Sequence, residues 1–339
     1  MEEAAFRAFS IPVDLIPTLD GLRRTVVITH VTPDADALAS MFAMAGAIGL
    51  GRAQSATVAL PAHSVSQRLA FLQERANPPV AGPQDVAEAD GFVVVDTAKK
   101  SRCNLPAGLP EAWDAGRPVI NIDHHESNTR FGTVNWIEGG ASSSAELAYG
   151  LIKAWDRPIP PLVASLLYAG LHTDTAGFSL PNTTARALAA AADLVERGAD
   201  VPDLGERLCR SQSLSEFKLL QTVYANTRLA ADGRIAYSTA DHAEMVAAGC
   251  TAADVDDQVS VPRSLRGTRI AMLFTEGLPG KTRINFRGES GVSILPLARA
   301  FGGGGHGAAA GAILDGTPQE IVARVLPEAE AYLNRHDRP

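Results

Sequence analysis

The stretch VVITHVTPDADALAS, residues 26–40, places His30, Asp34 and Asp36 directly after a short apolar run. The apolar run suits a strand buried on both faces. ALASMFAMAGAIGL, residues 37–50, has the length and composition of a helix. A strand, a loop and a helix in this order are typical of a parallel sheet covered by helices. The two aspartates could cap the helix, or the loop could hold a metal ion.

The alternation of strand and helix continues through the first half of the chain. Further helix-like segments occupy 63–76 and 142–155, and the valine- and isoleucine-rich runs that suit buried strands lie at 25–29, 92–96 and 118–122. In the helix at 142–155, Ser143 and Glu146 have the spacing of a capping box. We interpret Ser143 as a helix N-cap rather than a nucleophile, and we predict an α/β domain with a parallel sheet.

The pattern changes near residue 185. Two helical segments, 185–200 and 214–229, are followed by strand-like runs at 233–240, 268–276 and 281–288. GLPG between the last two runs predicts a turn that joins antiparallel strands. We therefore predict two domains and a connection: a parallel-sheet domain over 1–188, a helical linker over 189–228, and a smaller mixed-sheet domain over 229–339.

Composition narrows the function. A chain of 339 residues with 46% hydrophobic content favours two globular domains. The sequence shows neither a secretory signal nor an apolar run of ~18 residues, so we expect a cytoplasmic protein without a membrane partner. The net charge of -8 works against binding a long nucleic acid, so a nucleic-acid substrate should be short. Three scattered cysteines argue against a disulfide framework and a cysteine zinc site.

Acids and imidazoles recur at the ends of the predicted strands, where parallel α/β sheets bind ligands. Each one alone could be a helix cap, a turn residue or a hydrogen-bonded buried imidazole. Their repetition at one edge favours a metal site, and ligands without thiolates suit Mn²⁺ or a similar cation. Two cations ~3.5–4 Å apart would need one bridging carboxylate. The candidate ligands are His30, Asp34, Asp36, Asp96, His124 and Asp174.

The stretch GGGGHGAAAG, residues 302–311, is the most biased in composition. It could be a flexible linker, but glycines also let backbone N–H groups approach an anion. It is not a P-loop, because the lysine and the Ser/Thr of that motif are absent.

HVTPDADALAS, VVVD, DHH and GLHTDTAGF, in this order, resemble the four motifs of the DHH phosphoesterase superfamily, and GGGGHGAAAG resembles the C-terminal DHHA1 motif. Over nearly its full length the chain resembles the compact NrnA-type oligoribonuclease and pAp phosphatase enzymes, or nanoRNases. The resemblance implies a cytoplasmic, metal-dependent hydrolase that converts oligonucleotides of about two to five nucleotides, RNA or DNA, to mononucleotides, and pAp to AMP. It implies two divalent cations, Mn²⁺ in the first place and Mg²⁺ or Co²⁺ as alternatives, that activate a water. It also allows a homodimer.

The resemblance also implies roles for individual residues. His30, Asp34 and Asp96 would hold one cation, and Asp36, Asp96, His124 and Asp174 would hold the other, with Asp96 as the bridge. Asp123 would orient an imidazole, and His125 would face the scissile phosphate. The residues that would contact the substrate are Arg287, Gly303, Gly304 and His306, although Arg287 could instead be a solvated charge at a strand end.

Several other functions share parts of this pattern. Hydrolysis of cyclic dinucleotides or of pApA would use the same motifs. The glycine-rich motif argues against an inorganic pyrophosphatase, and an exonuclease of long strands would carry further domains. A nucleotide-binding regulatory protein on the same fold would have no need of all six metal ligands.

Overall fold

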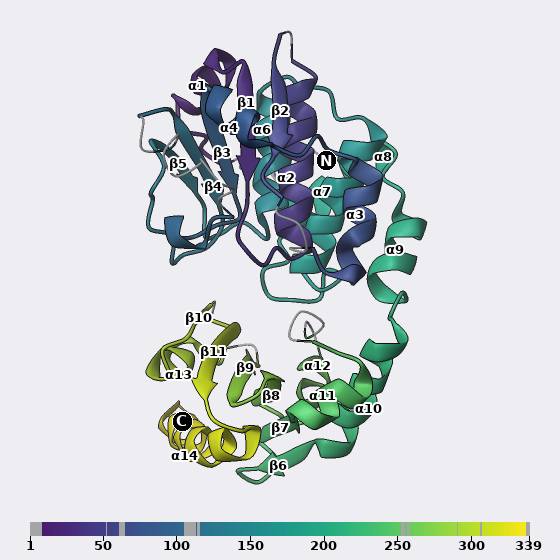
Figure 1. The fold of residues 1–339 in the computed structure, drawn as a ribbon, viewed down its shortest axis with the longest axis vertical. Helices are drawn as coiled ribbons and strands as arrows, with labels where there is room; N and C mark the ends of the chain where they lie inside the picture. The colour runs from purple at the N-terminus through teal and green to yellow at the C-terminus, as the bar shows by residue number, and fades with distance from the viewer. Residues whose placement is uncertain are drawn as a thin grey trace. The chain divides into compact units, whose positions relative to one another are not determined.

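The computed structural model describes residues 9–51, 53–60, 65–104, 113, 116–251, 255, 258–289, 291–305 and 307–336. Contacts divide the chain into two compact units, Met1–Ser211 and Gln212–Pro339 (Figure 1). The division falls inside the segment 189–228, which the sequence predicts as a helical linker. Among the described residues, every helix is too short or too polar to span a bilayer.

The first unit contains a five-stranded parallel sheet with the strand order β2-β1-β3-β4-β5 (Figure 1). This confirms the predicted parallel sheet. The three predicted strands lie within one residue of their observed bounds, whereas the short edge strands β2 and β5 were not predicted. The strands are Arg24–Ile28 (β1), Ser55–Val58 (β2), Gly91–Val95 (β3), Val119–Asp123 (β4) and Val134–Ile137 (β5).

Successive strand residues point to opposite sides of this sheet. Both faces are apolar, so helices cover both of them. Val27 and Val93 pack in one core with α2, α6 and α7, and Val26 and Val94 pack in another with α4. Of the helix predicted over 63–76, residues 63 and 64 lie outside the described residues, and helical structure begins at residue 67. The helices are Leu15–Gly21 (α1), Ala35–Gly49 (α2), Gln67–Leu69 (η1), Ala70–Ala76 (α3), Pro83–Glu88 (α4), Lys100–Arg102 (η2), Ser144–Ala154 (α6), Pro161–Asp174 (α7), Ala185–Glu196 (α8) and Val201–Cys209 (α9).

The second unit contains a six-stranded mixed sheet with the order β10-β11-β9-β8-β7-β6. Only the β7–β8 pair is parallel among these described strands, and the predicted antiparallel pair is β8 and β9. The mixed sheet predicted for the second domain is therefore confirmed. The strands are Arg228–Ala230 (β6), Ile235–Ala240 (β7), Ile270–Leu278 (β8), Lys281–Gly288 (β9), Gly304–Gly305 (β10) and Ala309–Asp315 (β11).

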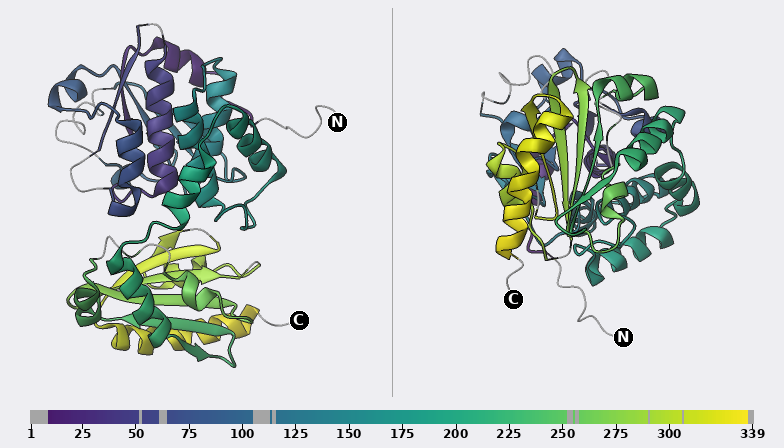
Figure 2. Two further views of the ribbon diagram at one scale, coloured as in Figure 1. Left: turned by 90° about the vertical axis from the view of Figure 1, so that its right-hand side faces the viewer. Right: turned by 90° about the horizontal axis from the view of Figure 1, so that it is seen from below.

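Helices also cover both faces of the second sheet (Figure 2). Met272 and Phe274 on β8 belong to the core that includes α14, whereas Ala271 and Leu273 belong to the core on the other face, with α10 and α11. The sheet is therefore buried on both sides. The helices are Leu214–Asn226 (α10), His242–Ala248 (α11), Ser260–Arg263 (α12), Leu295–Ala300 (α13) and Pro318–His336 (α14).

Candidate metal centre

The residues predicted as metal ligands come from the carboxyl ends of three neighbouring central strands and from two helices. His30 follows β1, Asp96 directly follows β3, and His124 directly follows β4. Asp36 lies in the first turn of α2, and Asp174 is the last residue of α7. The parallel sheet therefore brings together segments that are far apart in the sequence.

Asp34 fits both interpretations of the opening stretch. Its carboxylate accepts a hydrogen bond from the backbone N–H of Ala37 at 3.0 Å and thereby caps α2. The same side chain offers an oxygen in a group with His30 and Asp96. Asp36, in contrast, is 2% exposed and does not cap the helix. A single turn thus presents two carboxylates in different environments.

Three overlapping groups of possible ligands lie at this edge, each with its ligand atoms within 4.8 Å of one another. Nε2 of His124 is 3.5 Å from Oδ1 of Asp96 and 3.5 Å from Oδ2 of Asp174. Nε2 of His30 is 3.6 Å from the other oxygen of Asp96. Asp96 therefore lies between the two sets predicted for the two cations. The groups are His30, Asp34 and Asp96; Asp36, His124 and Asp174; and Asp96, His124 and His125.

Asp96 has an unusual backbone conformation. Its φ of 51° lies in the left-handed region, which is uncommon for residues other than glycine. The backbone N–H of Asp96 donates to the carbonyl of Ile122 at 3.0 Å, so the residue is held by the neighbouring strand. Strained residues of this kind concentrate at functional sites, where the surrounding structure fixes them.

The carboxylates of the site have divergent pKa values. Burial, followed by the negative charges of Asp96 and Asp34, raises the pKa of Asp36 well above its ordinary value. Burial and the neighbouring carboxylates likewise raise the pKa of Asp174. Burial also acts to raise the pKa of Asp96, but the hydrogen bond with His30 and the charges of His125 and His124 outweigh it and lower that pKa. The raised pKa values of Asp36 and Asp174 indicate that the positive charges of the protein do not offset all the carboxylates of the site.

The residues present fit divalent cations. Four aspartates would balance two such ions, and mixed carboxylate and imidazole ligands suit hard to borderline metals. Within the described part of the chain, Nδ1 of the buried His30 makes no hydrogen bond. Cys103, which pairs with His30 in an isolated β-bridge, is an unsuitable ligand because burial raises the pKa of its thiol to about 12.

Asp123 and His125 form a hydrogen-bonded pair beside the metal centre. Asp123 is fully buried, and its Oδ1 lies 2.7 Å from Nδ1 of His125. Oδ2 of Asp123 accepts from Nδ2 of Asn128 at 2.6 Å. Burial alone would lower the pKa of His125, but the hydrogen bond with Asp123 and the charge of Asp96 raise it to about 9. The His125 imidazole is thus held as a positively charged group close to the carboxylates.

The first turn of α6 also reaches the site, and the sequence did not reveal this. Ser144 and Ala145 donate their backbone N–H groups to the two oxygens of Asp36, at 2.7 and 2.9 Å. The hydroxyl of Ser144 donates to Oδ1 of Asp96 at 3.0 Å. The predicted N-cap is its neighbour Ser143, whose hydroxyl accepts from the N–H of Glu146 at 3.1 Å. In the sequence, the run of three serines at 142–144 was the feature that could have pointed to this contact.

The predicted substrate residues lie in the second unit. Arg287 is on β9, half-buried, opposite Ala309 of β11, and Gly304 is on β10, opposite Gly311 of β11. A Cβ atom on Gly303 would lie 2.2 Å from the carbonyl oxygen of Gly311, so this glycine allows a close backbone approach. Gly304 is exposed with open space beside it. His306 lies outside the described residues.

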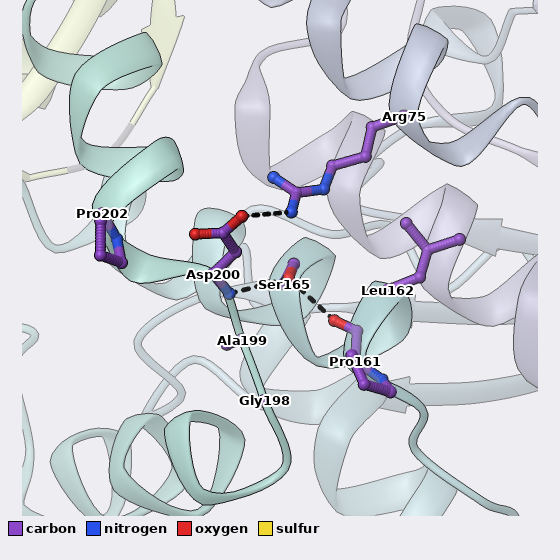
Figure 3. Close-up of a pocket in the computed structure, with 8 residues that line it drawn as sticks. All are labelled: Arg75, Pro161, Leu162, Ser165, Gly198, Ala199, Asp200 and Pro202. Carbon is purple, nitrogen blue, oxygen red and sulfur yellow. Dashed lines mark hydrogen bonds and ion pairs between the residues drawn. The ribbon is translucent and has the colours of Figure 1, made fainter.

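A separate pocket of about 510 Å³ lies in the first unit (Figure 3). Arg75 at its edge pairs with Asp200 at 3.0 Å and with Asp203 at 2.8 Å. Pro161 lines it and begins α7, so the pocket lies at the opposite end of this 14-residue helix from Asp174, on the order of 20 Å away. None of the predicted site residues that the structure describes lines this pocket.

The DHH family, N-terminal domain, matches residues 24–171. The chain is 30% identical over 316 residues to the bifunctional oligoribonuclease and PAP phosphatase NrnA of Thermus thermophilus, covering 91% of this chain and 90% of that protein. It is 26% identical to the protein of the same description from Bacillus subtilis, covering 96% and 99%. An exopolyphosphatase-related protein from Bacteroides fragilis has a similar fold, with a TM-score of 0.82, 21% identity, and coverage of 94% and 96%.

Proposed function

Because this chain belongs to the DHH family, as a member of the NrnA type, we propose that it is a metal-dependent phosphoesterase that hydrolyses short oligonucleotides to mononucleotides and pAp to AMP. The observation that carries the proposal is the joint grouping of carboxylates and imidazoles around Asp96. The relatives from Thermus thermophilus and Bacillus subtilis are described as both oligoribonuclease and PAP phosphatase, which supports these two substrate classes.

The proposed ligands divide into two sets that share Asp96. His30, Asp34 and Asp96 would hold one cation, and Asp36, His124 and Asp174 would complete the set for the other. When bound, the two cations supply an activated water and offset negative charge on the phosphate. We propose Mn²⁺ as the cation, with Mg²⁺ and Co²⁺ as alternatives, because mixed carboxylate and imidazole ligands suit hard to borderline ions.

Asp123 and His125 would act on the phosphate side of the site. The fully buried Asp123 accepts from Nδ1 of His125, which fixes the orientation of the ring and leaves Nε2 to face the substrate. A protonated imidazole can donate a hydrogen bond to a phosphoryl oxygen or give its proton to the leaving oxygen. In the metal-free protein the hydrogen bond with Asp123 and the charge of Asp96 raise the pKa of His125, which favours the protonated ring that this role needs.

Arg287, Gly303, Gly304 and His306 are proposed to contact the substrate from the second unit. An arginine can bind a phosphate through two parallel hydrogen bonds, and exposed glycine amides can approach an anion closely. The net charge of -8 supports short substrates, since a few local contacts suffice for them whereas a long strand calls for an extended basic groove.

The deciding experiment incubates the purified chain with Mn²⁺, Mg²⁺ or Co²⁺ and a panel of substrates. The panel contains pAp, pApA, cyclic di-AMP, and RNA and DNA oligonucleotides of two to about two dozen nucleotides. We expect the fastest turnover on dinucleotides to pentanucleotides with Mn²⁺, and turnover of pAp. Preferred hydrolysis of cyclic di-AMP or of long strands would contradict the proposed substrate class.

A variant without one proposed ligand is the control for this assay. Asp36→Ala removes a buried carboxylate, and we expect it to abolish hydrolysis of every substrate in the panel while the protein stays folded. Full Mn²⁺-dependent turnover by this variant would contradict the metal-centre assignment. Nucleotide binding without hydrolysis by the wild-type chain would instead favour a regulatory protein.

The proposal extends to a cytoplasmic enzyme that forms a homodimer. Light scattering after size-exclusion chromatography would measure the mass in solution against the 35.6 kDa of one chain. A mass of one chain at assay concentrations would contradict the homodimer.

A further inference from the structure

The N-terminus of α6 contacts two of the proposed metal ligands at once. The backbone N–H of Ser144 donates to Oδ2 of Asp36 at 2.7 Å, and the hydroxyl of the same residue donates to Oδ1 of Asp96 at 3.0 Å. The N–H of Ala145 donates to the other oxygen of Asp36 at 2.9 Å. Ser144 thus joins a carboxylate on α2 to a carboxylate at the end of β3.

We propose that Ser144 is a positioning residue for the metal centre, which holds the Asp36 and Asp96 carboxylates in a fixed relation before the cations bind. The inference rests on the proposed metal site but not on the identity of the substrate. Asp96 is the shared ligand of the two proposed sets, so its orientation matters for both cations. Partners of this kind are commonly worth about 10- to 100-fold in metal affinity or activity.

The surroundings leave the Asp36 carboxylate little freedom. The hydroxyl of Ser40 donates to its Oδ1 at 3.2 Å, in addition to the two backbone N–H groups from α6. On the side of α7, a Cβ atom added to Gly170 would lie 2.6 Å from the same oxygen. The positive end of the α6 dipole also favours a carboxylate at this position. Asp36 is therefore held by hydrogen bonds and confined by packing.

A purely structural role for the Ser144 hydroxyl would be the capping of α6. That role belongs to Ser143, whose hydroxyl accepts from the N–H of Glu146 at 3.1 Å. Ser144 and Ser143 are both fully buried and adjacent in the sequence. Of these two described hydroxyls, that of Ser144 is hydrogen-bonded to a proposed metal ligand, whereas that of Ser143 is bonded to the backbone of its own helix. The two serines therefore form a matched pair for separating positioning from helix stability.

The test compares Ser144→Ala with Ser143→Ala in the full chain. Isothermal titration calorimetry with MnCl₂ on the metal-stripped proteins measures the affinity for the cation without any substrate. We expect Ser144→Ala to weaken Mn²⁺ binding by about 10- to 100-fold. We expect Ser143→Ala to keep the wild-type affinity but to lower the melting temperature of the metal-free protein. Electron paramagnetic resonance should show a coupled Mn²⁺ pair in wild type and Ser143→Ala, and a weaker pair signal in Ser144→Ala.

Unchanged Mn²⁺ affinity in Ser144→Ala, or an equal loss in Ser143→Ala, would overturn the proposal. If Ser144→Ala does not fold, Ser144→Thr and Ser144→Val provide the same comparison, because they have similar shapes and only threonine retains the hydroxyl. The Thr variant should then bind Mn²⁺ more tightly than the Val variant, and equal affinities would overturn the proposal. Failure of the substrate panel would leave this result standing, because the binding measurement uses the metal alone.

Discussion

Oδ1 of the fully buried Asp123 lies 2.7 Å from Nδ1 of His125, which makes this pair the shortest described ion pair among the residues around Asp96. Because Asp123 is fully buried, water could replace His125 as its hydrogen-bond partner only if the site opened. The hydrogen bond between the two side chains therefore stabilises the protonated form of His125. It also makes the site sensitive to pH.

We predict that the His125 pKa of the metal-free protein is near 9 and that Asp123→Asn lowers it. Because the pKa of His125 is raised in the fold, its contribution to stability is complete below about pH 6.5 and is lost as the pH rises through about 9. Nuclear magnetic resonance of the His125 ring and melting temperatures from pH 6 to 10 measure both effects.

Asn128→Ala is the control for the Asp123 prediction. It removes the partner of Oδ2 of Asp123 but keeps the negative charge beside His125. The His125 pKa in this variant should stay above that in Asp123→Asn. Equal His125 pKa values in the two variants would show that the charge of Asp123 is not what raises it.

Asp174→Asn should stabilise the metal-free protein at neutral pH. It should also remove the stabilisation that the wild type gains when Mn²⁺ binds. The raised pKa of Asp174 means that its contribution to stability is present below the unfolded value and lost as the pH rises through the folded value. An asparagine avoids this loss. At a metal concentration 100 times the dissociation constant, the wild type should gain about 2.7 kcal/mol in free energy of unfolding. The same gain in Asp174→Asn, measured by thermal melting with and without Mn²⁺, would contradict Asp174 as a ligand.

Two helical glycines should respond in opposite ways to alanine. Gly150 in α6 has open space at its Cβ position, so Gly150→Ala should stabilise the protein by roughly 0.5–1 kcal/mol. A Cβ on Gly170 in α7 would lie 2.6 Å from the Cβ of Ala145 and from Oδ1 of Asp36. Gly170→Ala should therefore cost about 1–3 kcal/mol and weaken Mn²⁺ binding. Denaturant unfolding measures the stability of each variant, and calorimetry measures its affinity for Mn²⁺. Equal changes in both quantities for the two variants would rule out a special role for Gly170.

The sequence was sufficient to predict the parallel sheet and the grouping of acids at its edge because both depend on local patterns. Each apolar run is a buried strand, and the residue that follows a strand is carried to the same edge as its neighbours. His30, Asp96 and His124 were therefore within reach of sequence reasoning. The edge strands β2 and β5 were missed because each has only four residues.

The contacts of α6 could not be predicted in the same way. Ser144 and Asp36 are separated by 108 positions, and their hydrogen bond depends on how α6 packs against α2. A serine beside a capping serine has no distinctive local signal. The open space beside Gly304 and the crowding beside Gly303 are likewise set by strand pairing with β11, which the alanine-rich sequence of that strand did not reveal.

Gly303→Ala and Gly304→Ala should separate folding from substrate binding in the glycine-rich stretch. A Cβ on Gly303 would lie 2.2 Å from the carbonyl oxygen of Gly311 and 2.9 Å from that of Ala298, so this variant should lose about 1–3 kcal/mol of stability. Gly304 has no atom within 4 Å of its Cβ position, so Gly304→Ala should fold normally. If a phosphate approaches the Gly304 backbone, the added methyl should raise KM for pAp and dinucleotides about tenfold, equivalent to about 1.4 kcal/mol, and leave Mn²⁺ affinity unchanged. Unchanged KM in Gly304→Ala would remove this glycine from the substrate site and leave Arg287, Gly303 and His306 as the proposed contacts.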